Sequence, residues 1–400
     1  MMINAERVNF EKIKNPGEFN GDISFLDSAI EFATKKTAAV MPDFVHKYPS
    51  ACSVSNYYQP VENASNDLGS EWTAGFWTGM LWLSYELTGN ELFRAVAEAQ
   101  FDDYEKRCKE FLRMSNHDIG FIYSPSVVAQ YKLTGAEKAR KLGLEAAQAL
   151  IRRYSEKAGI IQVRERNEQG NFIIDCCMNL PLLYWAGKET GDRSYYMKAM
   201  THISRAAECM VRDDASSYAI YKIDEVTGEK VKGWQGQGHS DNSCWARGQS
   251  WIIYGLALSY VYTFDKDLLE LAKRTANYFL NRLPSDHICN WDLIFTEDDG
   301  ERDSSTAPVV ACGLLEISKH LSADDEYKEI YKRAAIDIVR NLAEKYTTQD
   351  IESNGLLKHG VYCKNKGKGG LGDNECCIWG DYFYMEALTR LKKEDWNLYW

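Results

Sequence analysis

One strongly apolar helix followed by one half-exposed helix recurs along the chain, and this alternation restricts the fold more than any other feature. The apolar stretches cover residues 75–87, 120–133, 178–189, 245–263, 305–320 and 378–391. After each of the first five, a short turn leads into an amphipathic stretch, at 91–114, 137–154, 195–211, 268–282 and 326–346. Apolar residues at helical spacing predict helices, and repeated helix pairs are typical of a helical array.

The number of apolar helices favours a closed ring. Residues 24–41 form one further amphipathic helix, which supplies the outer partner that the last apolar helix lacks. We therefore predict an all-α fold, an (α/α)6 barrel of six helical hairpins, because an open solenoid would leave its apolar ends in water. Residues 1–400 are predicted to form one catalytic domain, with residues 1–22 as a loosely ordered N-terminal lead.

Unusual polar and aromatic residues gather in the segments that lead into the apolar helices. In such a ring the inner helices run parallel, so these segments open at the same end. They hold Trp72, Asn116, His117, Asp118, Asp175, Gln237, His239, Trp245 and Arg247. We expect a site at this mouth.

Asp175 stands at the end of a short apolar run and directly before a strongly apolar helix. Taken alone, an aspartate in that place is a typical helix N-cap, and the same interpretation suits Asp118. Two carboxylates that meet across a mouth also suit acid–base chemistry, in which one group transfers a proton and the other tunes it. The nearby histidines, glutamine, arginine and tryptophans favour the catalytic interpretation.

The tryptophans and the arginine also have structural alternatives. Trp72, Trp245 and Trp251 fit a hydrophobic core, although Trp72 and Trp245 lie beside polar residues, where an indole ring can stack on a sugar. Arg247 is either the ion-pair partner of a nearby aspartate or a clamp for a substrate carboxylate, which a guanidinium holds in bidentate fashion.

No metal and no cofactor are expected. The seven histidines show no HxH or HxxxH spacing, so the sequence predicts no metal site. Residues 367–372 match the GxGxxG dinucleotide pattern by letter, but no strand–helix unit surrounds them. The loop that carries Lys368 either contacts an anionic substrate at the rim or is simply solvated.

Charge and cysteine usage limit the partners and the compartment. A net charge of −11 argues against nucleic-acid and membrane binding, because both need a basic surface. Eleven cysteines without CxxC spacing are typical of reduced thiols. The N-terminal stretch lacks an apolar signal core, and no segment has an uninterrupted apolar run long enough to cross a membrane. We therefore expect a cytoplasmic protein, and the oligomeric state stays open.

With these residues in view, the chain resembles the unsaturated glucuronyl hydrolases of glycoside hydrolase family 88. The resemblance runs from about Trp72 to Arg390. Its most specific stretches are GFWTGMLW (75–82), NHDIGF (116–121), IIDCCMNLPLLYW (173–185), DNSCWARGQSWIIYG (241–255), LLKHGVY (356–362) and CIWGDYFYMEAL (377–388). The family's (α/α)6 barrel agrees with the ring that the helix repeat predicts.

The resemblance implies an activity and roles for individual residues. The expected reaction removes a 4,5-unsaturated uronic acid from the non-reducing end of lyase-generated glycosaminoglycan disaccharides by hydrating a vinyl ether. The partner is then an unsaturated uronate-containing oligosaccharide. Asp175 matches the acid/base position, and Asp118 matches the second essential aspartate. The matched substrate-binding positions are Trp72, Asn116, His117, Gln237, Trp245, Arg247 and Trp251.

Two departures from the family pattern bear on specificity. Some relatives carry a histidine after a Ser-Ser-Tyr run, whereas Ala219 follows residues 216–218 here, so that role is absent or passes to His239. Some relatives hold a sulfate with serines and a lysine in the last loop, which here reads KNKGK (364–368). The alternatives are an unsaturated rhamnogalacturonyl hydrolase acting on pectin fragments and a non-catalytic sugar-binding helical ring.

Overall fold

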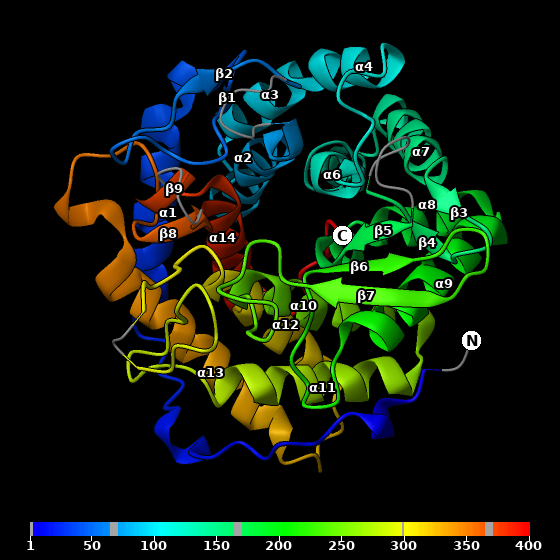
Figure 1. Cartoon of the computed structure of the whole chain (residues 1–400). Coiled ribbons are helices and arrows are strands. Elements are labelled where there is room, and N and C mark those ends of the chain that lie inside the picture. The colour runs from blue at the N-terminus through cyan, green and yellow to red at the C-terminus, as the bar shows by residue number, and fades with distance from the viewer. Residues whose placement is uncertain (1–2, 65–70, 164–169, 298–299, 365–370) are drawn as a thin grey trace.

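Six inner helices form a ring in the computed structural model, which describes residues 3–64, 71–163, 170–297, 300–364 and 371–400 (Figure 1). In chain order they are α2 (Ala74–Thr88), α5 with α6 (Ile119–Tyr123 and Ala129–Thr134), α8 (Pro181–Thr190), α10 (Ala246–Thr263), α12 (Ala307–His320) and α14 (Ile378–Lys392). Helix α14 contacts α2, and this contact closes the ring. The predicted barrel is confirmed.

A second layer of helices surrounds the inner ring. It consists of α1 (Leu26–Val40), α3 with α4 (Glu91–Ala99 and Phe101–Lys109), α7 (Glu137–Ile151), α9 (Arg193–Met210), α11 (Lys266–Leu280) and α13 (Tyr327–Asn341). Helix α1 contacts both α14 and α2, as expected for the missing outer partner. Within the described residues, every helix is too short or too polar to cross a membrane.

Short helical turns complete these layers. They are η1 (Ala5–Arg7), η2 (Pro16–Glu18), η3 (Met41–Phe44), η6 (Ile174–Met178), η7 (Leu342–Tyr346) and η8 (Thr348–Asp350). A π-helical turn, η5 (Ser124–Val128), also divides the second inner helix, although the sequence predicts one helix over 120–133. The turn contains Pro125, which has no N–H for the helical ladder and crowds the preceding turn.

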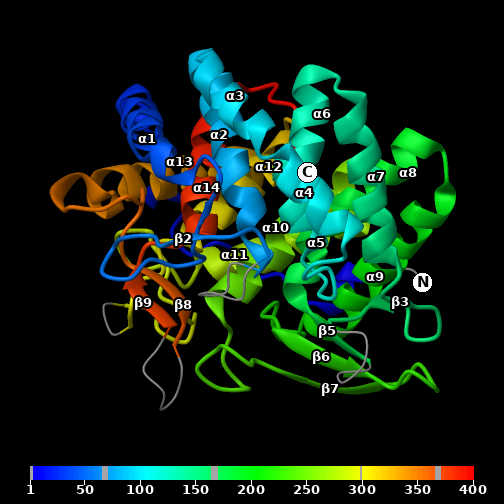
Figure 2. The same ribbon diagram turned by 90° about the horizontal axis from the view of Figure 1, so that it is seen from above.

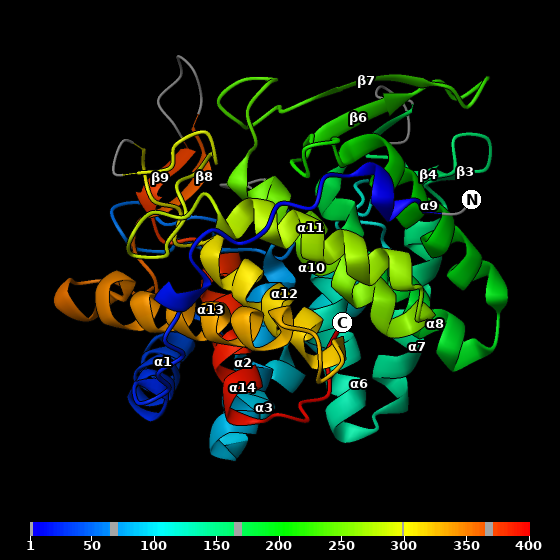
Figure 3. The same cartoon turned by 90° about the horizontal axis from the view of Figure 1, so that it is seen from below.

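Short strands lie where the sequence pattern predicts only loops. β1 (Tyr48–Pro49) pairs with β2 (Pro60–Val61), β3 (Tyr154–Ser155) with β4 (Ile160–Ile161), and β8 (Gly360–Cys363) with β9 (Leu371–Glu375). β5 (Asn171–Ile173), β6 (Ile220–Ile223) and β7 (Lys230–Trp234) form an antiparallel sheet in that order. Strands this short show too little alternation to be recognised. Figure 2 shows β5 to β9 at one end of the ring, and Figure 3 shows β6 to β9 at the same end.

The N-terminal lead runs along the outside of the ring. Arg7 donates to backbone carbonyls at the end of α9, at 2.6 and 2.7 Å. The backbone N–H groups of Asn20 and Gly21 donate to the carboxylate of Asp337 on α13. The sequence predicts a loosely ordered lead, whereas these hydrogen bonds, together with the burial of Val8, hold the described part against the outer helices.

The C-terminal residues fill the end of the ring opposite the sheets. Figure 1 shows the C-terminus within the outline of the ring. Trp400 stacks on Phe383 of α14 with ring centroids 5.7 Å apart, and its Nε1 donates to Glu386 at 2.7 Å. Lys132 of α6 donates to the backbone carbonyls of residues 398–400. Only the other end of the ring is therefore left for a mouth.

A buried ion-pair network joins three inner helices. Arg390 of α14 donates to Glu316 of α12 at 2.7 Å, to Glu386 at 3.0 Å and to the hydroxyl of Tyr254 on α10. Burial alone would raise the pKa of Glu316, but the charges and hydrogen bonds of Arg390 and His320 together outweigh burial and lower that pKa to about 2. Charges this deep are tolerated because they are paired.

Replacing Arg390 with methionine should lower the free energy of unfolding by about 3 to 5 kcal/mol, because two buried carboxylates lose the arginine that they share. Denaturant unfolding measures the loss. Lys392→Met is the matched control, since Lys392 lies on the same helix and pairs with Asp27 at the surface. This control should change the free energy of unfolding by less than about 1 kcal/mol. Equal losses in the two variants would contradict a structural role for the buried network.

Candidate active site

Three titratable side chains meet at the mouth of the ring. The Nε2 atom of His117 lies 2.7 Å from Oδ1 of Asp175 and 3.3 Å from Oδ1 of Asp118. The side chains of His117 and Asp118 are 4% and 12% exposed, whereas the Asp175 side chain is 22% exposed. Of the three groups, Asp175 therefore offers the most surface to a substrate. We call these three residues the acid cluster.

A close contact between α5 and η6 brings the acid cluster together. Gly120 has no β-carbon, and one built there would lie 2.5 Å from Cα of Asn179. The Asn179 Oδ1 atom accepts the backbone N–H of Phe121 at 2.8 Å, and its Nδ2 donates to the backbone carbonyl of Asp175 at 3.2 Å. One amide side chain thus joins the start of α5 to the segment that carries Asp175.

The turn before α5 is held from inside the protein. Asn116 Oδ1 accepts the backbone N–H of Asp118 at 3.2 Å. Buried Arg153 donates from Nε to the backbone carbonyl of Asn116 at 2.8 Å. Asn116, which the sequence predicts as a substrate-binding residue, therefore also shapes the turn that presents His117 and Asp118.

Neither aspartate caps a helix with its side chain. Asp118 is the N-cap residue of α5, but its carboxylate accepts no capping hydrogen bond from the described residues. Asp175 lies inside η6, whose N-cap is Ile173. The alternative interpretation as two N-caps is therefore wrong, because α8 begins only at Pro181 and His117 takes the Asp175 carboxylate.

The acid cluster is arranged to hold a proton near neutral pH. Burial raises the pKa of Asp118 to about 7, although the charge of His117 opposes this shift. Burial alone would lower the pKa of His117, but the charges of Asp118 and Asp175 outweigh burial and raise it to about 9. A proton is thus retained beside the more exposed Asp175, which suits general acid catalysis.

Aromatic rings form a wall next to the acid cluster. Trp72 is half-buried, and its ring centroid lies 5.1 Å from that of Trp379 and 5.7 Å from that of Phe121. Its Nε1 donates to the hydroxyl of Tyr362 at 3.0 Å. Phe121 follows Asp118 by three residues on α5, so the wall and the cluster share one short helix.

Arg247 is held between aromatic rings. Its guanidinium carbon lies 4.5 Å from the ring centre of Trp245 and 4.8 Å from that of Trp379. Its nitrogens donate to two backbone carbonyls of β8, at 2.6 and 2.7 Å, and to Gln237 Oε1 at 2.9 Å. No ion pair joins Arg247 to a carboxylate of the described residues, so its charge is left to act on an anionic ligand.

The other predicted site residues lie at different depths. His239 is exposed, and its ring lies 6.2 Å from that of Trp291. Trp251 is buried in α10 between two phenylalanine rings, with centroids 5.2 and 5.6 Å away, so it supports the floor of the mouth from below. Lys368 lies outside the described residues.

Two residues of the site have no strong sequence signal. Tyr362 comes from β8, a strand of four residues in a region without helical periodicity. Asn179 looks like one more polar residue at the start of an apolar helix, and only its contact with Gly120 shows its role. Both matter because of contacts between segments far apart in the chain, which periodicity does not report.

The acid cluster also has the composition of a metal site. One ligand atom from each of His117, Asp118 and Asp175 lies within 4.8 Å of the others. Sequence spacing gives no sign of this group, because 58 residues separate His117 from Asp175. The prediction of a metal-free site rests on the sequence.

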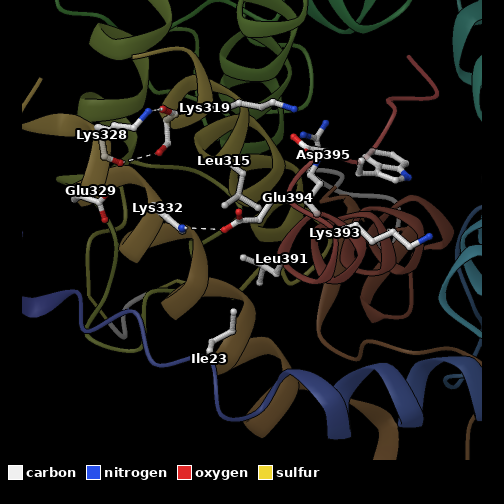
Figure 4. Close-up of a pocket in the computed structure, with 13 residues that line it drawn as sticks. Ile23, Leu315, Lys319, Lys328, Glu329, Lys332, Leu391, Lys393, Glu394 and Asp395 are labelled. Carbon is white, nitrogen blue, oxygen red and sulfur yellow. Dashed lines mark hydrogen bonds and ion pairs between the residues drawn. The ribbon is translucent and has the colours of Figure 1, made fainter. Parts of the chain in front are cut away.

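A separate cavity of about 340 Å³ lies at the opposite end of the ring, among α12, α13 and the end of α14 (Figure 4). Lys328 there donates to two backbone carbonyls at the end of α12, both at 2.9 Å. Lys332 lies 3.7 Å from Glu394. These contacts engage both lysines within the protein, and the cavity is remote from the acid cluster.

Comparison with known proteins finds similarity over nearly the whole chain. The model of the family described as Glycosyl Hydrolase Family 88 matches residues 43–393. The chain is 42% identical to an unsaturated chondroitin disaccharide hydrolase of Streptococcus pneumoniae, with 99% of this chain and 100% of the relative covered.

Solved structures show the same similarity over the whole chain. The crystal structure of an unsaturated glucuronyl hydrolase from Streptococcus agalactiae superposes with a TM-score of 0.93 and 39% identity, with 100% of both chains covered. A mutant of unsaturated glucuronyl hydrolase from the same organism, complexed with dGlcA-GalNAc6S, superposes with a TM-score of 0.87 and 38% identity, again with 100% of both chains covered.

The imidazole of His117 should titrate at about pH 9, because two carboxylates favour its charged form. His202 is the internal control, since burial lowers its pKa to about 3 and it should stay neutral above that pH. Replacing Asp118 with asparagine removes one of the two carboxylates and should lower the pKa of His117. Histidine-selective ¹⁵N NMR measures both rings. A pKa of about 6.5 for His117, unchanged by Asp118→Asn, would contradict the cluster.

Proposed function

We propose that this chain, which belongs to glycosyl hydrolase family 88, removes the 4,5-unsaturated uronic acid from the non-reducing end of lyase-generated glycosaminoglycan disaccharides. The observation that carries the proposal is the acid cluster at the mouth of the ring. The names of the relatives, which refer to unsaturated chondroitin disaccharides and to unsaturated glucuronyl groups, support this substrate class.

The two aspartates are arranged unlike those of a classical glycosidase. In such enzymes two carboxyl groups flank the scissile bond, with the sugar between them. Here Asp118 and Asp175 both approach Nε2 of the same buried imidazole, so His117 occupies the space between them. A shared, proton-holding cluster fits protonation of a carbon–carbon double bond better than displacement at the anomeric carbon.

In the proposed reaction, the enzyme hydrates the double bond of the sugar. Asp175 takes a proton from His117 and gives it to C4, and the positive charge that develops at C5 is shared with the ring oxygen. A water attacks C5 and returns a proton through Asp175 to His117, which restores the protonated cluster. The resulting hemiketal opens the ring, and the hemiacetal left at C1 releases the rest of the sugar chain as an alcohol.

His117 and Asp118 are proposed to maintain Asp175 for this step. His117 fixes the orientation of the Asp175 carboxylate through the 2.7 Å hydrogen bond. Asp118 has a pKa of about 7, so it can accept or release a proton as the reaction changes the charge of the cluster. Asn116 shapes the turn that carries both residues.

The aromatic wall and the residues around Arg247 are proposed to bind the unsaturated sugar. Trp72 and Trp245 offer aromatic faces for stacking, and Arg247 with Gln237 supplies charge and polarity for the uronate carboxylate. His239 at the rim and Lys368 in the last loop are proposed to contact the leaving sugar, whereas Trp251 supports the floor.

The nearest alternative is an unsaturated rhamnogalacturonyl hydrolase, which shares the chemistry but acts on pectin fragments. Rates on unsaturated chondroitin, hyaluronan, heparin and pectin disaccharides distinguish the two. We also propose that the whole chain is one catalytic domain and that it works in the cytoplasm. All eleven cysteines are free thiols, which supports a reducing compartment.

Replacing Asp175 with asparagine should lower kcat by about 10²- to 10⁴-fold, because the amide cannot donate the acidic proton. The substrate is an unsaturated chondroitin disaccharide, whose ultraviolet absorbance disappears when its conjugated double bond is hydrated. Asp213→Asn is the control, since the Asp213 side chain is 89% exposed on the outer surface. Normal turnover by Asp175→Asn would remove Asp175 from the mechanism, and a protein that binds the disaccharide without consuming it would be the non-catalytic ring.

Exhaustive chelation should leave turnover unchanged, because the proposed reaction uses only protons and water. The measurement compares turnover of the disaccharide before and after chelation, and again after addition of Zn²⁺ or Mn²⁺. Loss of activity with recovery on metal addition would reassign the acid cluster as a set of metal ligands.

A further inference from the structure

One face of the β5–β6–β7 sheet carries an apolar row that starts beside the acid cluster. The antiparallel ladder pairs Ile173 with Ile220, and Ile220 with Trp234. Directly paired residues point to the same face of a sheet. Asp175 follows Ile173 by two residues, so the row leads away from the catalytic carboxylate.

The other face of the sheet is covered by the protein. Phe172 pairs with Tyr221, is fully buried, and lies 5.6 Å from the ring of His202 on α9. The apolar row is therefore on the side away from α9. Ile220 of that row packs against the buried group that contains Trp245, which places this face toward the mouth.

Two lysines lie on the same face, one pair further along the strands. Lys222 pairs with Lys232, and each is two residues from a member of the apolar row. Both side chains are exposed, and the Nζ atom of Lys232 lies 5.6 Å from the ring centre of Trp234. Among the described residues, no carboxylate lies within ion-pair distance of either lysine. Figures 1 and 2 show this sheet at the mouth end, with β7 as its outermost strand.

We infer that Ile220, Lys222, Lys232 and Trp234 form a binding site for a second uronate. This uronate lies on the reducing side of the scissile bond in substrates longer than a disaccharide. Neighbouring strands lie about 4.8 Å apart, so Trp234 is roughly 10 Å from Ile173 and beyond the sugar that is released. This inference rests on the proposed function, because it extends the same substrate along the sheet.

The charges favour an anionic occupant over a neutral one. The chain carries a net charge of −11, so a uronate-bearing oligosaccharide is repelled by the molecule as a whole. Two adjacent lysines without ion-pair partners among the described residues supply positive charge on this face. Trp234 adds a half-buried aromatic face of the kind on which sugar rings stack. Disaccharides end before this surface, whereas a tetrasaccharide carries a second uronate onto it.

The test compares unsulfated unsaturated chondroitin disaccharide with the corresponding tetrasaccharide. The variants are Lys222→Gln with Lys232→Gln, and Trp234→Ala. Lys230→Gln is the matched control, because Lys230 lies on the same strand but pairs with Glu208 of α9 at 2.9 Å. The double lysine variant should raise KM for the tetrasaccharide by about three- to tenfold, with kcat and the disaccharide KM unchanged. Trp234→Ala should show the same selectivity, and Lys230→Gln should change neither KM.

Salt gives a second readout of the same contact. The tetrasaccharide KM of the unaltered enzyme should rise with ionic strength, and this dependence should weaken in the double lysine variant. An unchanged tetrasaccharide KM, or an equal rise for both substrates, would overturn the inference.

Calorimetry separates this inference from the proposed function. If the unaltered protein turns over neither substrate, the proposed function fails. Binding of the tetrasaccharide to the unaltered protein and to the double lysine variant then decides the sugar site. Weaker binding by the variant supports it, and equal affinity or absence of binding overturns it.

Discussion

The close contact between Gly120 and Asn179 is the constraint on which the site depends. A β-carbon at position 120 would lie 2.5 Å from the Asn179 Cα, so only glycine lets α5 begin this close to η6. Asn179 uses the contact to bind the backbone of both segments. The imidazole of His117 then reaches Asp118 and Asp175 at the same nitrogen. A shift of about 1 Å between the two helical segments would separate these groups, and proton transfer tolerates little misplacement.

The buried charges between the inner helices and those at the mouth titrate differently. Between the inner helices, Arg390 pairs with both Glu316 and Glu386, and the pKa of Glu316 is lowered to about 2. At the mouth, two carboxylates share one imidazole, and burial raises the pKa of Asp118 to about 7. Asp118 can therefore change its protonation state near neutral pH, whereas Glu316 stays charged. The fixed charges support the scaffold, and the titrating group supports the chemistry.

The sequence predicts the helical layers well, because each helix buries a face that its own periodicity reveals. It also predicts which loops meet at the mouth, because the segments that lead into parallel inner helices all open at the same end of the ring. The strands β5 to β9 escape prediction because each has five residues or fewer. The environment of Arg247, held between Trp245 and Trp379, also escapes, because it depends on contacts across the ring. The cap interpretation of Asp118 and Asp175 fails for the same reason, since a partner 58 residues away binds the Asp175 carboxylate.

The central claim is that the acid cluster delivers a proton to carbon and does not cleave the glycosidic bond directly. Turnover of an unsaturated chondroitin disaccharide in D₂O, followed by NMR of the released uronate product, tests this most directly. Hydration of the double bond predicts one deuterium at C4 of the product at the first appearance of free sugar. Release of the sugar with the C4–C5 double bond intact, and without deuterium at C4, would contradict it.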